Sequence, residues 1–157
     1  MGIEIERKFL VKNNNFKKDS YKKNYLKQGY LSSDKNRTVR IRITDSTAYI
    51  TIKGASNSTG TTRFEWEKEI LKTEAEDLLL LCKDIIIEKT RYLIKVDNYT
   101  FEVDEFYGAN DGLIVAEVEL NAENDVYRKP EWLGKEVTGD VKYYNSSISK
   151  HPYKDWK

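Results

Sequence analysis

Short segments in which charged and apolar side chains alternate constrain the fold of this chain more than any other feature. In the first of them, Glu4, Glu6 and Lys8 alternate with a mostly apolar set that runs from Ile3 to Val11. Side chains at positions i and i+2 share one face of a β-strand, so this period predicts strands with two unlike faces. The pattern recurs in eight segments, which we predict to be strands over 3–12, 24–32, 37–44, 47–53, 62–70, 86–95, 99–106 and 113–120.

The connections between these segments are mostly short and favour antiparallel neighbours. Turn-forming residues occupy 44–46, 96–98 and 108–112, where hairpins are expected. A run of antiparallel strands joined in this way favours a closed or nearly closed barrel. The expected fold class is therefore α+β, mainly antiparallel β, with an eight-stranded barrel tunnel, a charged interior and a few covering helices.

Three segments outside the predicted strands have helical signals. Thr73 and Glu76 form a capping box ahead of a leucine-rich run, so a helix is expected to begin there and to pack outside the sheet. Two shorter helices are expected over 122–128 and 130–137, although Gly134 weakens the second.

Composition bounds the class of protein. The chain has 157 residues, which suits a single domain over 1–157. Its formal net charge is +1, which argues against a nonspecific nucleic-acid or membrane binder, because such proteins carry a basic excess. Cys82 is the single cysteine, and no segment approaches the roughly 20 apolar residues of a membrane span. A reducing cytoplasm is the expected location.

The charged faces carry two nearly balanced sets of side chains. The carboxylates are Glu4, Glu6, Glu65, Glu67, Glu102, Asp104, Glu117 and Glu119, and the cations are Lys8, Arg40, Arg42, Lys53, Arg63, Lys89 and Arg91. Many lie in pairs of like sign two residues apart, which repel each other on a bare surface. A divalent cation offsets repulsion between carboxylates, and a polyanion offsets repulsion between cations. The paired acids and bases therefore suit a metal ion and a phosphate chain in one cavity.

The alternative is an ordinary antiparallel sheet whose charged face is solvated. If the charged faces instead point inward, the apolar faces point outward and must be covered. The leucine-rich helix, the segments around Trp132 and Tyr143–Tyr144, or a homodimer partner would supply that cover.

The order of the charged pairs resembles that of a known family. The triphosphate tunnel metalloenzymes, also called the CYTH superfamily, have motifs in the same order as Glu4–Lys8, Arg40–Arg42, Thr51–Gly54, Glu65–Glu67, Glu88–Tyr92, Glu102–Asp104 and Glu117–Glu119. The chain is similar in particular to the small single-domain bacterial inorganic triphosphatases of that family. The resemblance implies an eight-stranded antiparallel barrel that forms a tunnel, in which basic residues hold a triphosphate and acidic residues hold Mg²⁺ or Mn²⁺.

Residue roles follow from the same resemblance. It implies that phosphate oxygens are bound by Lys8, Arg40, Arg42, Lys53, Arg63 and Arg91, and that the metals are served by Glu4, Glu6, Glu67, Asp104, Glu117 and Glu119. Lys89 resembles a lysine proposed in some members to help activate the attacking water, a role that needs a lowered pKa. Lys142 sits where relatives often carry arginine and is a further candidate for phosphate binding.

The expected function is metal-dependent hydrolysis of a small triphosphate, with inorganic tripolyphosphate cleaved to pyrophosphate and phosphate. The expected partner is thus a small molecule, with no nucleic acid and no membrane. A nucleotide enzyme, either an ATPase or an adenylate cyclase, is an alternative from the same family, and a noncatalytic polyphosphate-binding module is an alternative from another class. The Gly/Ser/Thr-rich segment 54–62 is expected to be a hairpin loop, with a lid over the tunnel as its functional alternative.

Overall fold

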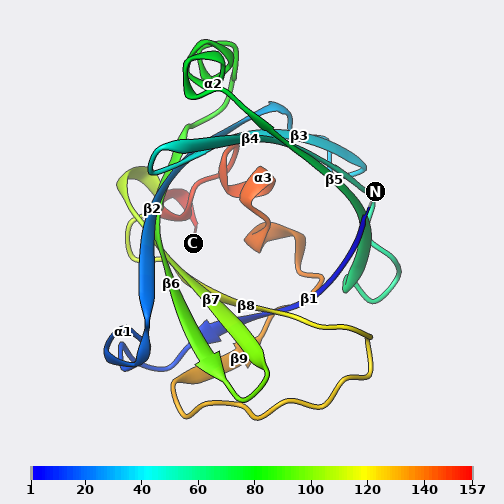
Figure 1. Cartoon of the computed structure of the whole chain (residues 1–157), viewed down its shortest axis with the longest axis vertical. Coiled ribbons are helices and arrows are strands. Elements are labelled where there is room, and N and C mark those ends of the chain that lie inside the picture. The colour runs from blue at the N-terminus through cyan, green and yellow to red at the C-terminus, as the bar shows by residue number, and fades with distance from the viewer. Residues whose placement is uncertain (1, 157) are drawn as a thin grey trace.

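The computed structural model describes residues 2–156, and within that range eight antiparallel strands close into a barrel (Figure 1). The strands are β1 (Gly2–Val11), β2 (Lys22–Ser32), β3 (Arg37–Thr44), β4 (Thr47–Gly54), β5 (Thr62–Ile70), β6 (Ile87–Val96), β7 (Tyr99–Phe106) and β8 (Ile114–Glu119). Their order around the barrel is β5-β4-β3-β2-β6-β7-β8-β1, and the pairing of β1 with β5 closes the ring. The expected strands and fold class are confirmed. Residues 1 and 157, the ends of the expected domain, lie outside the described range.

The three predicted hairpins are present. They join β3 to β4, β6 to β7 and β7 to β8, and each pair is antiparallel. Asp45 and Asp97 occupy the first two turns with φ of 53° and 56°. Aspartate tolerates this left-handed region better than most residues, which is why these short turns form at these positions.

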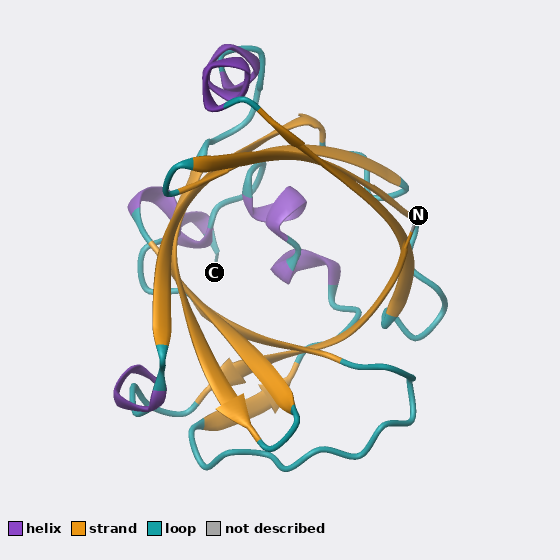
Figure 2. Ribbon diagram, viewed as in Figure 1, coloured by secondary structure: helices purple, strands orange, loops and turns teal. Residues whose placement is uncertain are grey.

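The remaining elements are short and mostly lie beside the barrel wall (Figure 2). They are α1 (Phe16–Asp19), α2 (Lys72–Leu79), η1 (Gly108–Asn110), β9 (Leu133–Glu136), η2 (Val141–Tyr143), α3 (Asn145–Ile148) and η3 (Tyr153–Asp155). One of them, α3, is seen inside the ring of strands when the barrel is viewed end on (Figure 1). None of the helices in residues 2–156 is long and apolar enough to cross a membrane.

The leucine-rich helix α2 forms outside the sheet as expected, but its cap differs from the predicted one. Leu71 has extended backbone angles and its N–H donates to the Glu74 carboxylate at 2.9 Å, so Thr73 and Glu76 lie within the helix rather than at its start. The apolar side of α2 packs on the outer face of β3 and β4, where Ala75 and Leu79 join a buried cluster.

The two short helices expected after β8 are absent from 122–128 and 130–137. Residues 122–128 form a loop, and the second segment contains the strand β9, which pairs with the end of β1. Backbone bonds fix this pairing, because Lys12 donates to the Trp132 carbonyl and Val137 donates to the Lys8 carbonyl, each at 2.8 Å. At Gly134 a Cβ would lie 3.0 Å from the Leu10 carbonyl oxygen. Glycine at this position therefore lets β9 approach β1 closely, which favours a strand here instead of the expected helix.

The outward apolar faces are covered from within the chain. Trp132 and Leu133 pack on Phe9, Phe101 and Val118 in the largest buried cluster, which fulfils the cover expected of the Trp132 segment. A second cluster, which contains Ile87, Phe106, Leu113, Val115 and Ile148, has its strand residues on the inward face, where Phe106 pairs with Lys89 and Val115 with Asp104. Tyr143 packs beside this inner cluster, so the Tyr143–Tyr144 segment does not supply the outer cover expected of it. Fully burying a large apolar side chain contributes about 1.5–3 kcal/mol to stability. These clusters therefore offset the free-energy cost of burying the charged side chains inside the barrel.

Candidate active site

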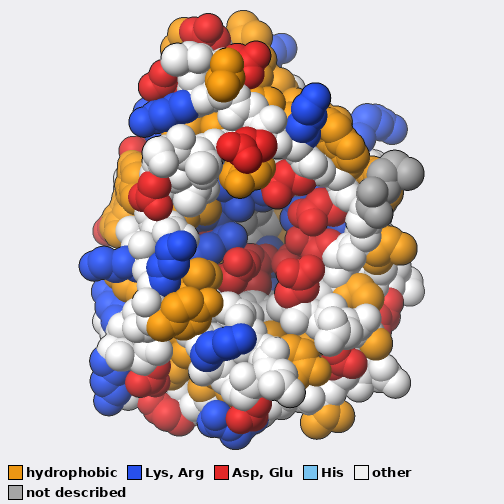
Figure 3. All heavy atoms as spheres, viewed as in Figure 1, with side chains coloured by type: hydrophobic (Ala, Val, Ile, Leu, Met, Phe, Trp, Pro, Cys, Tyr) orange, Lys and Arg blue, Asp and Glu red, His pale blue; other side chains and the backbone are white. Residues whose placement is uncertain are grey.

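The charged faces of the strands line one internal cavity of about 220 Å³ (Figure 3). All the predicted inward-facing acids and bases line it except Lys89 and Asp104. Because these charges line a cavity rather than the outer surface, the alternative of a solvated sheet face is wrong. The space-filling view shows acidic and basic side chains gathered around the hollow.

Strand register brings residues that are far apart in sequence to facing positions. Glu6 on β1 lies opposite Glu119 on β8, and Lys8 lies opposite Glu117. The period-two alternation then repeats this charged face along each strand. The site is thus a direct product of antiparallel pairing, which aligns the like-charged pairs of neighbouring strands.

Two arginines on β3 form the buried basic part of the cavity. Arg40 donates to Thr51 at 3.1 Å and lies 3.5 Å from the Glu67 carboxylate, but its buried Nε has no hydrogen-bond partner within residues 2–156. Arg42 donates from Nε to the Gln28 side-chain oxygen at 2.9 Å. Burial, together with the nearby charges of Arg40 and Arg91, lowers the pKa of Arg42 to about 9. This crowding of cations and an unpaired N–H both suit an anion.

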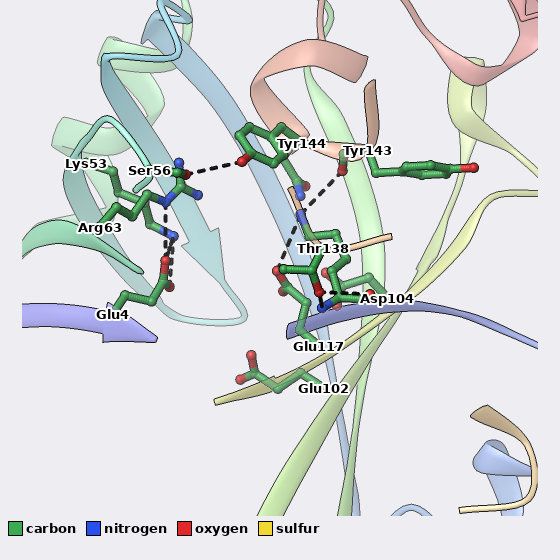
Figure 4. Close-up of polar contacts among 12 residues, drawn as sticks. Glu4, Lys53, Ser56, Arg63, Glu102, Asp104, Glu117, Thr138, Tyr143 and Tyr144 are labelled. Carbon is green, nitrogen blue, oxygen red and sulfur yellow. Dashed lines mark hydrogen bonds and ion pairs between the residues drawn. The ribbon is translucent and has the colours of Figure 1, made fainter. Parts of the chain in front are cut away.

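Glu4 is held between two cations on one side of the cavity (Figure 4). Lys53 lies 2.9 Å and Arg63 lies 3.4 Å from its carboxylate oxygens. Burial raises the pKa of Glu4, but the charges of Lys53 and Arg63 outweigh it and the net pKa is lowered. Glu4 is therefore ionised at neutral pH.

Glu6 and Glu117 are neighbouring cavity carboxylates that shift each other's pKa. Burial and the neighbouring charges of Glu117 and Glu4 hold the pKa of Glu6 well above its usual range. Burial acts in the same direction on Glu117, but Lys8 and Arg91 outweigh it, so the pKa of Glu117 lies well below its usual range. Lys8 is 3.6 Å from Glu117. Glu6 therefore holds its proton to a higher pH than Glu117 does.

The donor set around this pair fits a divalent cation by its chemistry. Glu4, Glu6, Glu117 and Glu119 supply carboxylate oxygens, which Mg²⁺ prefers, and the raised pKa of Glu6 reports a crowding of negative charge that such an ion would relieve. Within residues 2–156, no three acidic, histidine or cysteine side chains already converge on one metal position. Binding would therefore draw these carboxylates together and away from their present cationic partners.

Lys89 and Asp104 share the inward face of the barrel but are buried and do not line the cavity. The Lys89 side chain is fully buried, with Nζ 2.8 Å from Asp104. Arg91 grips the same carboxylate with two bonds, of 2.8 and 2.9 Å, so both Asp104 oxygens are engaged. Burial, reinforced by Arg91 and Arg42, lowers the pKa of Lys89 to about 7, although Asp104 opposes the shift. The role that the family resemblance implies for Lys89 needs a lowered pKa of this kind.

A neutral residue of α3 joins this buried group to the cavity. The Asn145 side-chain oxygen accepts from Lys89 Nζ and from Gln28 Nε2, each at 2.9 Å. Asn145 lines the cavity, whereas Lys89 does not. Because Gln28 also accepts from Arg42, one hydrogen-bonded chain links Arg42, Gln28, Asn145 and Lys89.

Sequence reasoning missed the uncharged part of the cavity wall. The additional lining residues are Tyr30, Thr38, Thr51, Tyr144, Asn145 and Ser146. Thr38 and Thr51 lie two residues from charged residues on β3 and β4, so they share the inward face. The period-two pattern could therefore have predicted that they line the cavity. The α3 residues had no such signal, because their position depends on where the tail packs.

Lys142 lies outside the cavity. Its side chain is exposed, and Nζ sits 4.6 Å from the centre of the Trp156 ring and 5.4 Å from that of Tyr143. Lys142 was expected to bind phosphate in the cavity. Tyr144 and Asn145, which follow it in the chain, line the cavity instead.

A closed antiparallel barrel whose paired acids and bases face one internal cavity is a tunnel-type architecture suited to a charged ligand. The chain belongs to the CYTH domain family, whose model matches residues 2–152. It is 48% identical over 158 residues to the inorganic triphosphatase of Acetivibrio thermocellus, with 100% of this chain and 99% of the relative covered. It is 35% identical over 150 residues to the inorganic triphosphatase of Nitrosomonas europaea, with 93% and 96% covered.

A solved structure agrees with these sequence relatives. The crystal structure of the inorganic triphosphatase NE1496 matches with a TM-score of 0.66 at 34% sequence identity. The match covers 93% of this chain and 97% of that one. The resemblance noted from the ordered motifs is therefore confirmed at the level of family and fold.

Proposed function

We propose that this chain is a metal-dependent triphosphatase that hydrolyses inorganic tripolyphosphate to pyrophosphate and orthophosphate. The observation that carries this proposal is one internal cavity whose wall holds both clustered carboxylates and clustered cations. Its volume of about 220 Å³ is below the roughly 300–1,000 Å³ of pockets that enclose drug-sized ligands, which favours a compact polyanion without a base or vitamin. The names of the two sequence relatives support the same activity.

The basic residues of the cavity would bind the phosphate oxygens. This set comprises Lys8, Arg40, Arg42, Lys53, Arg63 and Arg91, all of which line the cavity. The unpaired Arg40 Nε supplies a donor that a phosphate oxygen would satisfy. Charge-assisted bonds of this kind are roughly twice as strong as neutral ones, so the set would hold a triphosphate in one orientation.

The carboxylates Glu4, Glu6, Glu117 and Glu119 would hold Mg²⁺ or Mn²⁺, with Glu67 a further candidate at the cavity wall. When bound, such an ion would neutralise charge on the phosphates and on the departing pyrophosphate. The two engaged oxygens of Asp104 favour a different role for that residue, namely holding Arg91 and Lys89 in place.

The protein's own contribution would be positioning and charge. Phosphoryl transfer needs an in-line arrangement of attacking and leaving oxygens and stabilisation of the equatorial oxygens, which the arginines supply. For Lys89, with its lowered pKa, to accept a proton from the attacking water directly, Asn145 would have to move aside, because its side chain separates Lys89 from the cavity and an amide does not relay a proton. The role of Lys89 and the other residue roles are part of this proposal. We also propose that residues 1–157 form a single domain, that the chain forms a homodimer and that it is located in the cytoplasm.

A substrate panel tests the activity. The purified chain would be given tripolyphosphate, ATP, thiamine triphosphate or long-chain polyphosphate, each with Mg²⁺ or Mn²⁺, and phosphate release would be measured. We expect tripolyphosphate to be the best substrate and to give orthophosphate and pyrophosphate only when metal is present. Cyclic AMP and pyrophosphate from ATP would identify an adenylate cyclase. Tight binding of tripolyphosphate without turnover would identify a binding module.

A further inference from the structure

The tail of the chain places an aromatic ring inside the cavity. Tyr144 lies between η2 and α3, in the segment seen within the ring of strands (Figure 1), and its side chain is 8% exposed. Its hydroxyl is 3.2 Å from Ser56 Oγ in the loop between β4 and β5, as Figure 4 shows. The ring is therefore fixed at both ends, by the backbone of the tail and by the opposite wall.

The ring also lies against two cations that would bind phosphate. Lys8 Nζ is 5.0 Å and the Arg63 guanidinium carbon 5.4 Å from its centre. Cations at such distances from an aromatic face are attracted to it, by about 0.5–2 kcal/mol. Tyr144 thus occupies space beside two of the cations that line the cavity.

A second, much smaller cavity shares Tyr144 with the first. Its volume is about 10 Å³, and its additional lining residues are Ser56, Gly60, Thr61, Thr138 and Gly139. That volume is at the lower limit for one water molecule. Lys8 and Arg63 line both cavities, as do Glu4 and Glu6. The ring is thus one part of the wall between two spaces that share the same charges.

The far side of the small cavity is closed by backbone. A Cβ placed on Gly60 would lie 2.3 Å from the Cα of Gly139, so the loop that contains Gly60 and the one that precedes η2 are in direct contact. Both glycines have positive φ, 77° and 80°, which glycine adopts without strain. The segment 54–62 therefore helps to seal this side of the barrel.

The other side of the cavity is acidic. Glu67 and Glu102 line it with side chains that are 42% and 41% exposed, whereas Lys8 is only 7% exposed. Arg40 and Arg91 already pair with these carboxylates, at 3.5 and 3.4 Å, so a phosphate that projected toward them would have to displace these ion pairs. A chain longer than the cavity would gain little by extending toward solvent and is blocked by Tyr144 in the other direction.

We propose that Tyr144 is the end wall that sets the length of phosphate chain this cavity accepts. The proposal rests on the proposed function and names a specificity-determining residue for it. Removing the ring would join the two cavities and open space for a fourth phosphate beside Lys8 and Arg63, which line both. Tyr144 therefore favours tripolyphosphate over tetrapolyphosphate by shape rather than by charge.

The test is the ratio of kcat/KM for tetrapolyphosphate to that for tripolyphosphate, measured with Mg²⁺. We expect Tyr144→Ala to raise this ratio by at least about 10-fold, since fit in a pocket commonly discriminates by roughly 10–200-fold. Tyr144→Phe keeps the ring and should leave the ratio within about twofold of wild type. Tyr21→Ala, at an exposed tyrosine far from the cavity, is the matched control. An unchanged ratio in folded Tyr144→Ala, or an equal rise in Tyr144→Phe, would overturn the proposal.

A replacement variant and a separate activity measurement distinguish failure of the Tyr144 proposal from failure of the proposed function. Tyr144→Leu retains apolar bulk without the length of the ring, so it replaces Tyr144→Ala if that variant does not fold, and a smaller rise in the ratio is expected. Hydrolysis of tripolyphosphate by the wild-type chain tests the proposed function separately. If there is no turnover, the ratio of dissociation constants for the two polyphosphates, measured by calorimetry, tests Tyr144, and an unchanged ratio in the variant would again overturn its role.

Discussion

The barrel wall and the tail segment 141–148 build the same cavity by different means. The wall supplies charge, from side chains that alternate along strands held by continuous backbone ladders. The tail supplies Tyr144, Asn145 and Ser146, which carry no charge and are held by side-chain contacts such as Tyr144 with Ser56. The wall thus determines what kind of ligand is attracted, and the tail determines the shape of the space that receives it.

The wall and the tail should also differ in how much their substitutions change the free energy of the transition state. The strands hold the backbone of these charged residues in place, so ligand binding requires only their side chains to exchange ion-pair partners, and charges positioned in this way contribute strongly to transition-state stabilisation. A short tail with few backbone bonds to the barrel can be altered at lower cost. Substitutions in the wall should therefore affect activity more than substitutions in the tail, and the predictions below follow that order.

The largest effect is expected from the acidic part of the wall. Glu6→Ala or Glu119→Ala should lower tripolyphosphate hydrolysis by about 10²–10³-fold or more, because a carboxylate that serves the metal is lost. Glu76→Ala, at an exposed position on α2, is the control and should retain activity. A second readout is thermal: Mg²⁺ should raise the Tm of wild type, since it binds the folded state, and should do so less in both variants. Unchanged turnover in both would contradict the metal assignment.

The next effect concerns Lys89 and pH. Its pKa of about 7 lies below the ordinary value of about 10.4, so the amine is charged below pH 7 and becomes neutral above it. If the neutral amine assists the attacking water, kcat should rise with pH through about 7. Lys89→Arg stays charged and should lose this rise, together with about 10²-fold in kcat. Persistence of the same pH dependence in Lys89→Arg would assign it to another group.

A smaller effect is expected at Arg91, whose planar fork makes two bonds to Asp104. Arg91→Lys keeps the charge but loses the fork, so we expect KM for tripolyphosphate to rise by about 10-fold while the fold is retained. Arg37→Lys, at an exposed arginine on β3, should change neither parameter. A change in kcat alone, with KM unaltered, would argue that Arg91 does not bind the ground-state substrate.

The difference between wall and tail also explains how much could be predicted from sequence. Alternation is a local signal, so all eight barrel strands and the inward set from Glu4 to Glu119 followed from it. The strand β9 was missed because it is short, contains Gly134 and exists only through its pairing with β1. A short edge strand leaves little pattern in its own residues.

The tail could not be placed for a related reason. The sequence at 141–148 does not record that Tyr144 enters the barrel while Lys142 turns toward Trp156, since that choice depends on the completed wall. The same holds for Lys89 and Asp104, which share the charged face in sequence but are buried and do not line the cavity. Alternation gives the direction of a side chain, whereas its depth depends on what packs above it.

The smallest effect, and the one that joins the two regions, is expected from Asn145→Ala. Lys89 and Gln28 would lose a shared acceptor, which should cost about 1–3 kcal/mol in the free energy of unfolding, measured by denaturant titration. Ser147→Ala, on the same helix, should cost less. Because an accepted bond favours the charged amine, its loss should also move the kcat rise of wild type to lower pH. A destabilised variant whose pH dependence is unmoved would show that Asn145 secures the tail without influencing Lys89.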